Sequence, residues 1–111
     1  MDPMEKKKVL ENLGDLPEDV YDGIVREFVK IGGDTLREIE KACQLNATDL
    51  LEEISHTLKG AAGNLGLIRI QEIAREMEKA AKSKDLTAFP GYIGELSKEI
   101  RQTGREFHSN N

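Results

Sequence analysis

His56 is the residue whose type and neighbours best suit chemistry in this sequence. A neutral imidazole has one ring nitrogen with a free lone pair, and histidine changes its charge near neutral pH. Such a nitrogen can attack phosphorus. Lys59 follows three residues later in the segment His-Thr-Leu-Lys-Gly-Ala-Ala-Gly, in which Gly60 comes directly after Lys59 and Gly63 ends the segment. The segment therefore predicts a nucleophilic histidine with a cation one helical turn away.

The apolar residues around His56 predict that its side chain faces solvent. At about 100° per residue, they fall within about 40° of the direction opposite His56 on a helical wheel. They are Leu51, Ile54, Leu58, Ala61 and Leu65. Gly60 and Gly63 lie on either side of His56, at about 40° and 340°. Each exposed glycine costs a helix about 1 kcal/mol relative to alanine. We therefore expect both to leave a flat approach for another macromolecule.

Charged residues on the same predicted helix can act on an incoming group. Lys59 can neutralise part of the charge of a phosphoryl group, which is about −2. The alternative is an ordinary surface lysine paired with Glu52 or Glu53. These two glutamates precede His56 by one turn. We expect them to lie where a partner would contact the helix.

Glu78 is the candidate partner of the imidazole. The helix that carries His56 and the next helix reverse direction near Leu65-Gly66, so the heights of His56 and Glu78 differ by about 5 Å at 1.5 Å per residue. Side chains tilt toward the N-terminus of their own helix, which narrows this gap. A carboxylate that accepts one ring N–H fixes the tautomer and raises the nucleophilicity of the other nitrogen. The alternative is a solvated residue on the flank of the helix.

The elements that must position these residues are all helices, because apolar residues recur at spacings of three and four. The predicted helices run from Pro3 to Leu13, from Pro17 past Cys43 with a kink at Gly32-Gly33, from Asn46 or Thr48 to Asn64, from Leu67 to Ala81, and from about Pro90 onward. Asn46 or Thr48 would cap the third helix, and Gly66 would end it. This all-α pattern predicts an antiparallel up-and-down four-helix bundle with a short additional N-terminal helix.

Each predicted helix has an apolar face that should form the core. In the helix after Pro17, these residues are Val20, Ile24, Phe28, Ile31, Leu36, Ile39 and Cys43. In the last two helices, they are Ile70, Ile73, Met77 and Ala80, followed by Ile93, Leu96, Ile100 and Phe107.

Length and composition limit the possible functions. A chain of 111 residues fits one domain over residues 1–111. Its formal net charge of −5 argues against nucleic acid or an anionic membrane as the partner. The sequence has one cysteine, Cys43, so an internal disulfide is excluded and a reducing compartment is expected. We expect Cys43 to be a small core residue. With no leader and no apolar run of about 20 residues, we expect a cytoplasmic protein.

The segment from His56 to Gly66, HTLKGAAGNLG, resembles the motif of histidine phosphotransfer (HPt) domains, which is His-x-x-Lys-Gly followed by small residues and a further glycine. The resemblance continues through Ala74, Met77, Glu78 and Ala81, and more loosely over residues 15–107. The family has a polar residue such as Gln or Glu at the position of Glu78. The resemblance implies a carrier without autonomous catalysis, which accepts a phosphoryl group on His56 from the phospho-aspartate of a receiver domain and passes it to another receiver.

The resemblance also implies the partners, which are response-regulator receiver domains and a hybrid sensor histidine kinase. We expect no cofactor or metal on this chain, because its carboxylates and histidines lack metal-ligand spacing. The Mg²⁺ needed for transfer is expected in the partner's receiver domain. Two alternatives remain at this point. One is a docking or structural bundle whose His56 never carries phosphate, and the other is a phosphotransfer segment of a larger hybrid kinase.

Overall fold

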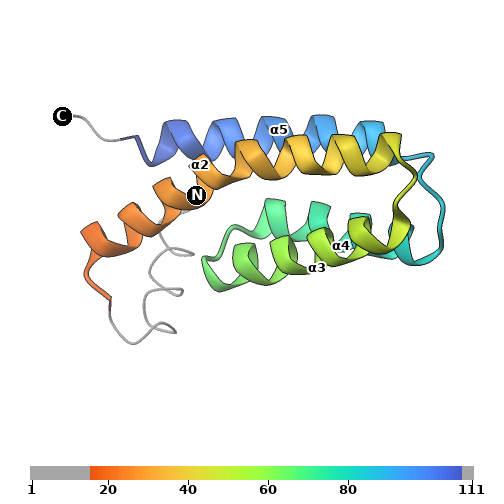
Figure 1. Cartoon of the computed structure of the whole chain (residues 1–111). Coiled ribbons are helices and arrows are strands. Elements are labelled where there is room, and N and C mark those ends of the chain that lie inside the picture. Colours follow the sequence, from red (N-terminus) through yellow and green to blue (C-terminus); the bar gives the residue numbers. More distant parts are fainter. Residues whose placement is uncertain (1–15, 109–111) are drawn as a thin grey trace.

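The computed structural model describes residues 16–108, which form four α-helices (Figure 1). They are α2 (Glu18–Gln44), α3 (Thr48–Asn64), α4 (Ile68–Lys82) and α5 (Phe89–Glu106). The all-helical class is confirmed for this part of the chain. The predicted helix from Pro3 to Leu13 falls outside the described residues. The up-and-down bundle order and the single domain over residues 1–111 stay predictions.

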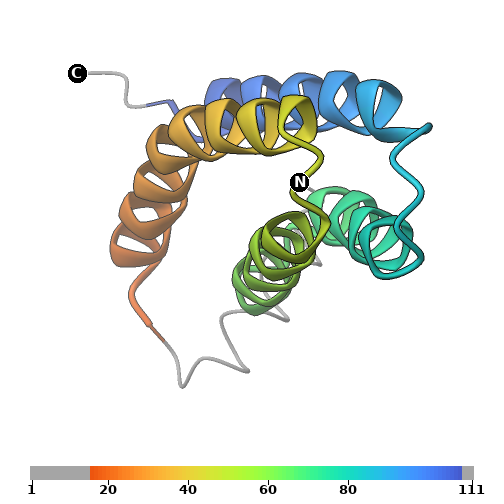
Figure 2. The same ribbon diagram turned by 45° about the vertical axis from the view of Figure 1, so that its right-hand side comes forward.

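The described helices lie in two pairs, α2 beside α5 and α3 beside α4 (Figures 1 and 2). In the second pair His56 meets Glu78, and Gly63 lies against Gln71. Contacts that occur later along α3 therefore occur earlier along α4, so the chain runs in opposite directions in the two helices. This pair carries the residues singled out for chemistry.

Glycines let α2 and α5 approach closely. A Cβ atom added at Gly32 would lie 3.1 Å from Ile100 Cδ1, and one added at Gly104 would lie 3.2 Å from Val29 Cγ1. The helix α2 continues through Gly32 and Gly33, and Figure 2 shows it bending between its orange and yellow parts. Gly32 therefore serves helix packing, and the glycine pair does not interrupt the helix.

Three helices end in the same kind of turn, each at a residue with positive φ. These residues are Asn46 (53°), Gly66 (72°) and Lys84 (58°). In each turn the next residue donates its amide hydrogen to the carbonyl oxygen five positions back, which is the Schellman arrangement. The prediction that Gly66 ends a helix is confirmed. The prediction that Asn46 or Thr48 caps α3 is wrong, because the N-cap residue is Ala47 and no side chain caps the helix.

The buried face of α2 differs from the predicted one. Val20, Ile24 and Ile31 are 44%, 42% and 54% exposed. The buried residues of α2 are Tyr21, Val25, Gly32, Ile39 and Ala42. The Tyr21 hydroxyl donates a hydrogen bond to the Leu65 carbonyl oxygen at 2.5 Å, and α5 approaches at Gly32. These contacts turn the buried face away from the more apolar one that the sequence pattern favours.

The later helices bury the faces that the sequence predicts, with small differences. The predicted core residues that are buried in α4, in α5 and just after α5 are Ile70, Ile73, Met77, Leu96, Ile100 and Phe107, while Ala80 and Ile93 are half-buried. In α3, Leu51 and Leu58 are buried as predicted, together with Ser55 and Ala62, whereas Ile54 and Ala61 of the predicted face are half-buried. The core side of α3 therefore remains opposite His56.

We predict different effects on stability for two adjacent alanine substitutions in α2. A Cβ atom at Gly33 meets nothing within 4 Å, so Gly33→Ala should stabilise the protein by up to about 1 kcal/mol. At Gly32 the same atom crowds Ile100, so overpacking should cancel or outweigh that gain. Chemical denaturation of both variants measures the two free energies of unfolding. Equal stabilisation would contradict the close packing of α2 on α5.

Candidate functional site

His56 lies in the middle of α3, on the side of the helix opposite the core. Its side chain is 68% exposed, as the helical wheel predicts. The adjacent residue Ser55 is fully buried, so the boundary between core and solvent runs between the two positions. The imidazole is thus open to an approaching molecule while its ring can still reach α4.

Glu78 holds the imidazole from α4. The distance between His56 Nδ1 and Glu78 Oε2 is 2.7 Å. An ionised carboxylate can only accept hydrogen bonds, so Nδ1 must carry the proton and donate it. The other nitrogen, Nε2, then keeps its lone pair. The structure thus brings together the two residues that the sequence analysis pairs.

Lys59 binds the same carboxylate. Its Nζ lies 2.6 Å from Glu78 Oε1, so each oxygen of Glu78 accepts one bond from α3. The alternative pairing of Lys59 with Glu52 or Glu53 is not the one that the structure shows. Glu78 itself is only 8% exposed.

The ionisation of Glu78 follows from these contacts. The hydrogen bond from Lys59 is the main cause that lowers the pKa of the Glu78 carboxyl, and the bond from His56 lowers it further. Partial burial acts in the opposite direction, because it disfavours the charged form. The net shift is downward, so Glu78 is a carboxylate at neutral pH and can accept both bonds.

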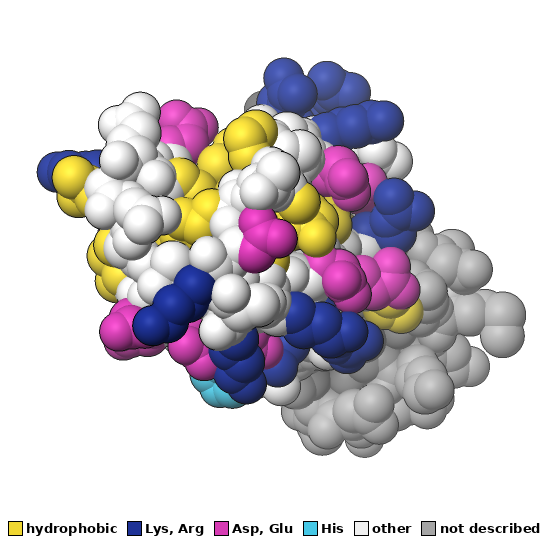
Figure 3. Space-filling view, turned by 90° about the vertical axis from the view of Figure 1, so that its right-hand side faces the viewer, with side chains coloured by type: hydrophobic (Ala, Val, Ile, Leu, Met, Phe, Trp, Pro, Cys, Tyr) yellow, Lys and Arg dark blue, Asp and Glu magenta, His cyan; other side chains and the backbone are white. Residues whose placement is uncertain are grey.

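A shallow depression beside the imidazole is lined by charged residues. They are Asp49, Glu52, Glu53, His56, Glu78 and Lys82. Figure 3 shows acidic and basic side chains gathered next to a histidine on one face of the molecule. The expected position of Glu52 and Glu53 beside His56 is thus the observed one. Asp49 and Lys82 are additions, and Lys82 could have been found because it follows Glu78 by one helical turn on the same face.

The two glycines near His56 have different surroundings. A Cβ atom at Gly60 would meet nothing within 4 Å, so the surface there is open. A Cβ atom at Gly63 would lie 2.5 Å from the side-chain nitrogen of Gln71. The space above Gly63 is therefore filled from α4, and of the two glycines only Gly60 has the open surroundings expected for a partner's approach.

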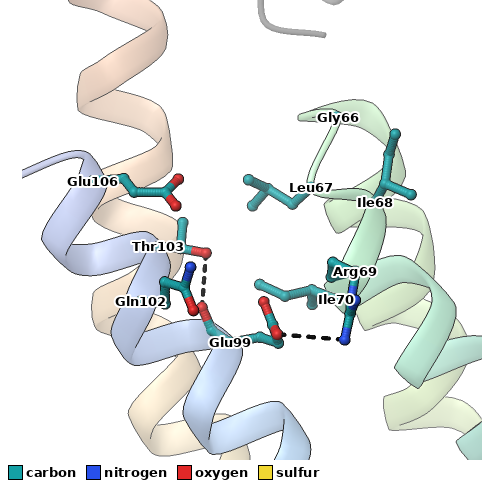
Figure 4. Close-up of a pocket in the computed structure, with 9 residues that line it drawn as sticks. All are labelled: Gly66, Leu67, Ile68, Arg69, Ile70, Glu99, Gln102, Thr103 and Glu106. Carbon is teal, nitrogen blue, oxygen red and sulfur yellow. Dashed lines mark hydrogen bonds and ion pairs between the residues drawn. The ribbon is translucent and has the colours of Figure 1, made fainter. Parts of the chain in front are cut away.

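Two further hollows lie between neighbouring helices. The one in Figure 4 is lined by Gly66, Leu67, Ile68, Arg69, Ile70, Glu99, Gln102, Thr103 and Glu106. There Arg69 pairs with Glu99 at 3.7 Å, and the Thr103 hydroxyl donates to the Glu99 carbonyl oxygen at 2.8 Å. The other is an apolar groove between α2 and α3, lined by Phe28, Ile31, Thr35, Glu38, Leu50, Glu53, Ile54, Thr57, Leu58 and Ala61. Neither hollow presents a histidine or cysteine.

Other reactive groups are few in the described part of the chain. Cys43 is half-buried, and burial raises the pKa of its thiol, with the charge of Glu40 adding to the effect, so the thiolate is disfavoured. Among residues 16–108, no three His, Cys, Asp or Glu side chains are grouped so that they could hold a metal ion. Within the same range no helix combines the length and apolar character needed to cross a bilayer.

Comparison with protein-family models shows a match to the Hpt domain over residues 23–106. Comparisons with curated proteins and with solved structures give no match. The matched segment includes all of α3 and α4, and with them His56, Lys59 and Glu78. It spans most of the sequence and confirms the resemblance seen in the segment from His56 to Gly66. The chain belongs to the Hpt domain family, whose members carry phosphoryl groups in histidine–aspartate phosphorelays.

Proposed function

We propose that this chain is a phosphocarrier that accepts a phosphoryl group on Nε2 of His56 from the phospho-aspartate of a receiver domain and passes it to another receiver. The observation that carries the proposal is the 2.7 Å contact between His56 Nδ1 and Glu78 in a side chain that is 68% exposed. One nitrogen is held by the protein, and the other is free to react.

The transfer is a displacement at phosphorus. The lone pair of Nε2 forms the N–P bond while the P–O bond to the aspartyl oxygen breaks, and the aspartate leaves as a carboxylate. The proton stays on Nδ1 of His56, so positive charge develops on the ring. Glu78 accepts the Nδ1 hydrogen bond and stabilises that charge. Transfer to the second receiver is the same step in reverse.

The partner supplies the remaining groups. Transfer from the phospho-aspartate of a receiver uses a divalent metal and charge neutralisation around the transferred group. We place the Mg²⁺ in the receiver domain. A response-regulator receiver would approach over the open surface at Gly60, with Glu52 and Glu53 at the edge of the contact. A hybrid sensor histidine kinase is the expected source of the phosphoryl group, and the cytoplasm is the expected compartment.

We predict that His56→Gln abolishes phosphorylation. Incubation with a phosphorylated receiver should give acid-labile, base-stable label on the wild-type chain and none on this variant. The fold should be unchanged within about 0.5 kcal/mol, because the side chain is exposed. The matched control is His108→Gln, which alters the other histidine of the sequence and should retain the label. Label on His56→Gln, or no label on the wild type with any receiver, would contradict the proposal, and the second result would favour a docking bundle.

We predict that Gly60→Gln blocks receiver docking but leaves the histidine reactive. Nothing lies within 4 Å of the Cβ position, so the variant should fold with at least wild-type stability. Transfer from a phosphorylated receiver should fall at least tenfold, whereas phosphorylation by the small donor phosphoramidate should be unchanged. Gly94→Gln, at another exposed helical glycine with an open Cβ position, is the matched control. Wild-type transfer from the receiver would show that the glycine has another role.

We predict that Glu78→Ala slows phosphorylation without abolishing it. The variant loses the group that keeps the proton on Nδ1, and a hydrogen bond of this kind contributes roughly 1 to 3 kcal/mol, which is about one to two decades in rate. Nitrogen chemical shifts of His56 should show the Nδ1–H tautomer in the wild type and a mixture in the variant. Equal shifts and equal rates would mean that Glu78 does not position the imidazole.

A further inference from the structure

The Glu78 carboxylate has two opposing effects on a phosphohistidine. It holds His56 Nδ1 at 2.7 Å and stabilises positive charge on the ring. The same negative charge lies close to the place where a phosphoryl group with about two negative charges must arrive. The carboxylate and the phosphoryl group are both negative and therefore repel each other. The repulsion is stronger because Glu78, at 8% exposure, is largely shielded from water.

The surroundings make this repulsion worse. The depression beside His56 has Asp49, Glu52 and Glu53 along its wall, and Lys82 is the cation among its lining residues. An acceptor for a phosphoryl group would be expected to have positive surroundings. Acceptance of a phosphoryl group here therefore requires a cation that compensates the charge of Glu78.

Lys59 provides that compensation through its position. Its Nζ lies 2.6 Å from Glu78 Oε1, on the oxygen that His56 does not use. Its side chain is 28% exposed, compared with 68% for His56, and it is not among the residues that line the depression. The ammonium group is thus turned toward the carboxylate of α4.

We propose that Lys59 acts through Glu78: it neutralises the carboxylate that holds His56, so that a phosphoryl group can be accepted beside it. Lys59 is then a positioning residue. This role is needed because residue 78 is a glutamate, which brings a negative charge to the site. A glutamine could accept the same hydrogen bond from Nδ1 without a charge. The inference rests on the proposed phosphorylation of His56.

A double-mutant cycle with phosphoramidate as donor tests this proposal without a protein partner. The chemistry balances, because Nε2 of His56 forms the N–P bond as the donor's P–N bond breaks and ammonia leaves. The proteins are the wild type, Lys59→Gln, Glu78→Gln and the double variant. We expect Lys59→Gln to react at least tenfold more slowly than the wild type, whereas the same substitution made in Glu78→Gln should have little effect. The double variant should return to within about threefold of Glu78→Gln.

A direct contact between Lys59 and the phosphoryl group predicts a different result. The loss caused by Lys59→Gln would then persist in the double variant, and this outcome would overturn the inference. Lys79→Gln is the matched control. It removes a lysine of α4 whose side chain is 67% exposed and pairs with Glu76 at 3.5 Å, and the reaction rate should not change. Circular dichroism of all variants confirms that they are folded.

A titration supplies a readout that does not depend on the reaction. Lys59 is the main cause of the lowered pKa of Glu78, so Lys59→Gln should raise this pKa in a carbon NMR titration of the carboxyl group. In the wild type, the lowered pKa stabilises the fold above the ordinary glutamate range, and this contribution is lost as the pH falls through the shifted value. An unchanged Glu78 titration would overturn the inference. Absence of label on the wild-type chain would instead overturn the proposed function itself.

Discussion

The two hydrogen bonds to the Glu78 carboxylate are the interaction on which the geometry of the site depends. Residues three apart on α3 reach the same side chain of α4, at 2.7 and 2.6 Å. A slip of one residue between the helices would move Glu78 by about 1.5 Å along its axis and 100° around it, and neither bond would survive. The site therefore requires a fixed register of α3 against α4.

That register is set by the turn and by the packing between the two helices. Gly66 adopts a φ of 72°, and the Leu67 amide donates to the Ala62 carbonyl oxygen, so the chain reverses within three residues. Ala62 and Ala74 are fully buried, and small side chains allow helices to pack closely. Gln71 occupies the space left open by Gly63. The glycines after His56 therefore serve the fold at one position and leave open surface at the other.

Much of this architecture follows from the sequence, because its signals are local. The end of α3 just before Gly66 and the start of α5 near Pro90 come from backbone preferences, and the outward position of His56 comes from helical periodicity. Features that depend on contacts between helices were harder to predict from the sequence. The buried face of α2 includes Gly32, which no hydrophobicity pattern would select, because contact with α5 decides it.

The partner of Lys59 is a second feature of this kind. The carboxylates nearest in the sequence are Glu52 and Glu53, but the lysine reaches across to α4. The distance and rotation between α3 and α4 determine which carboxylate Lys59 reaches. Neither quantity can be predicted from the sequence of one helix alone. The approach of Glu78 to His56 could be predicted because the short turn fixes their relative heights. The direction of a long, flexible lysine side chain could not.

The bonded residues of the site all belong to one helical hairpin, residues 48–82, and are only 19 and 22 positions apart in the chain. A hairpin of this length forms its contacts without closing long loops, which favours early assembly during folding. The helices α2 and α5 pack against the apolar side of the hairpin, but they contribute no atom to the hydrogen bonds of the Glu78 carboxylate. The same hairpin, grafted onto another helical scaffold that covers its apolar side, should therefore retain the reactive geometry.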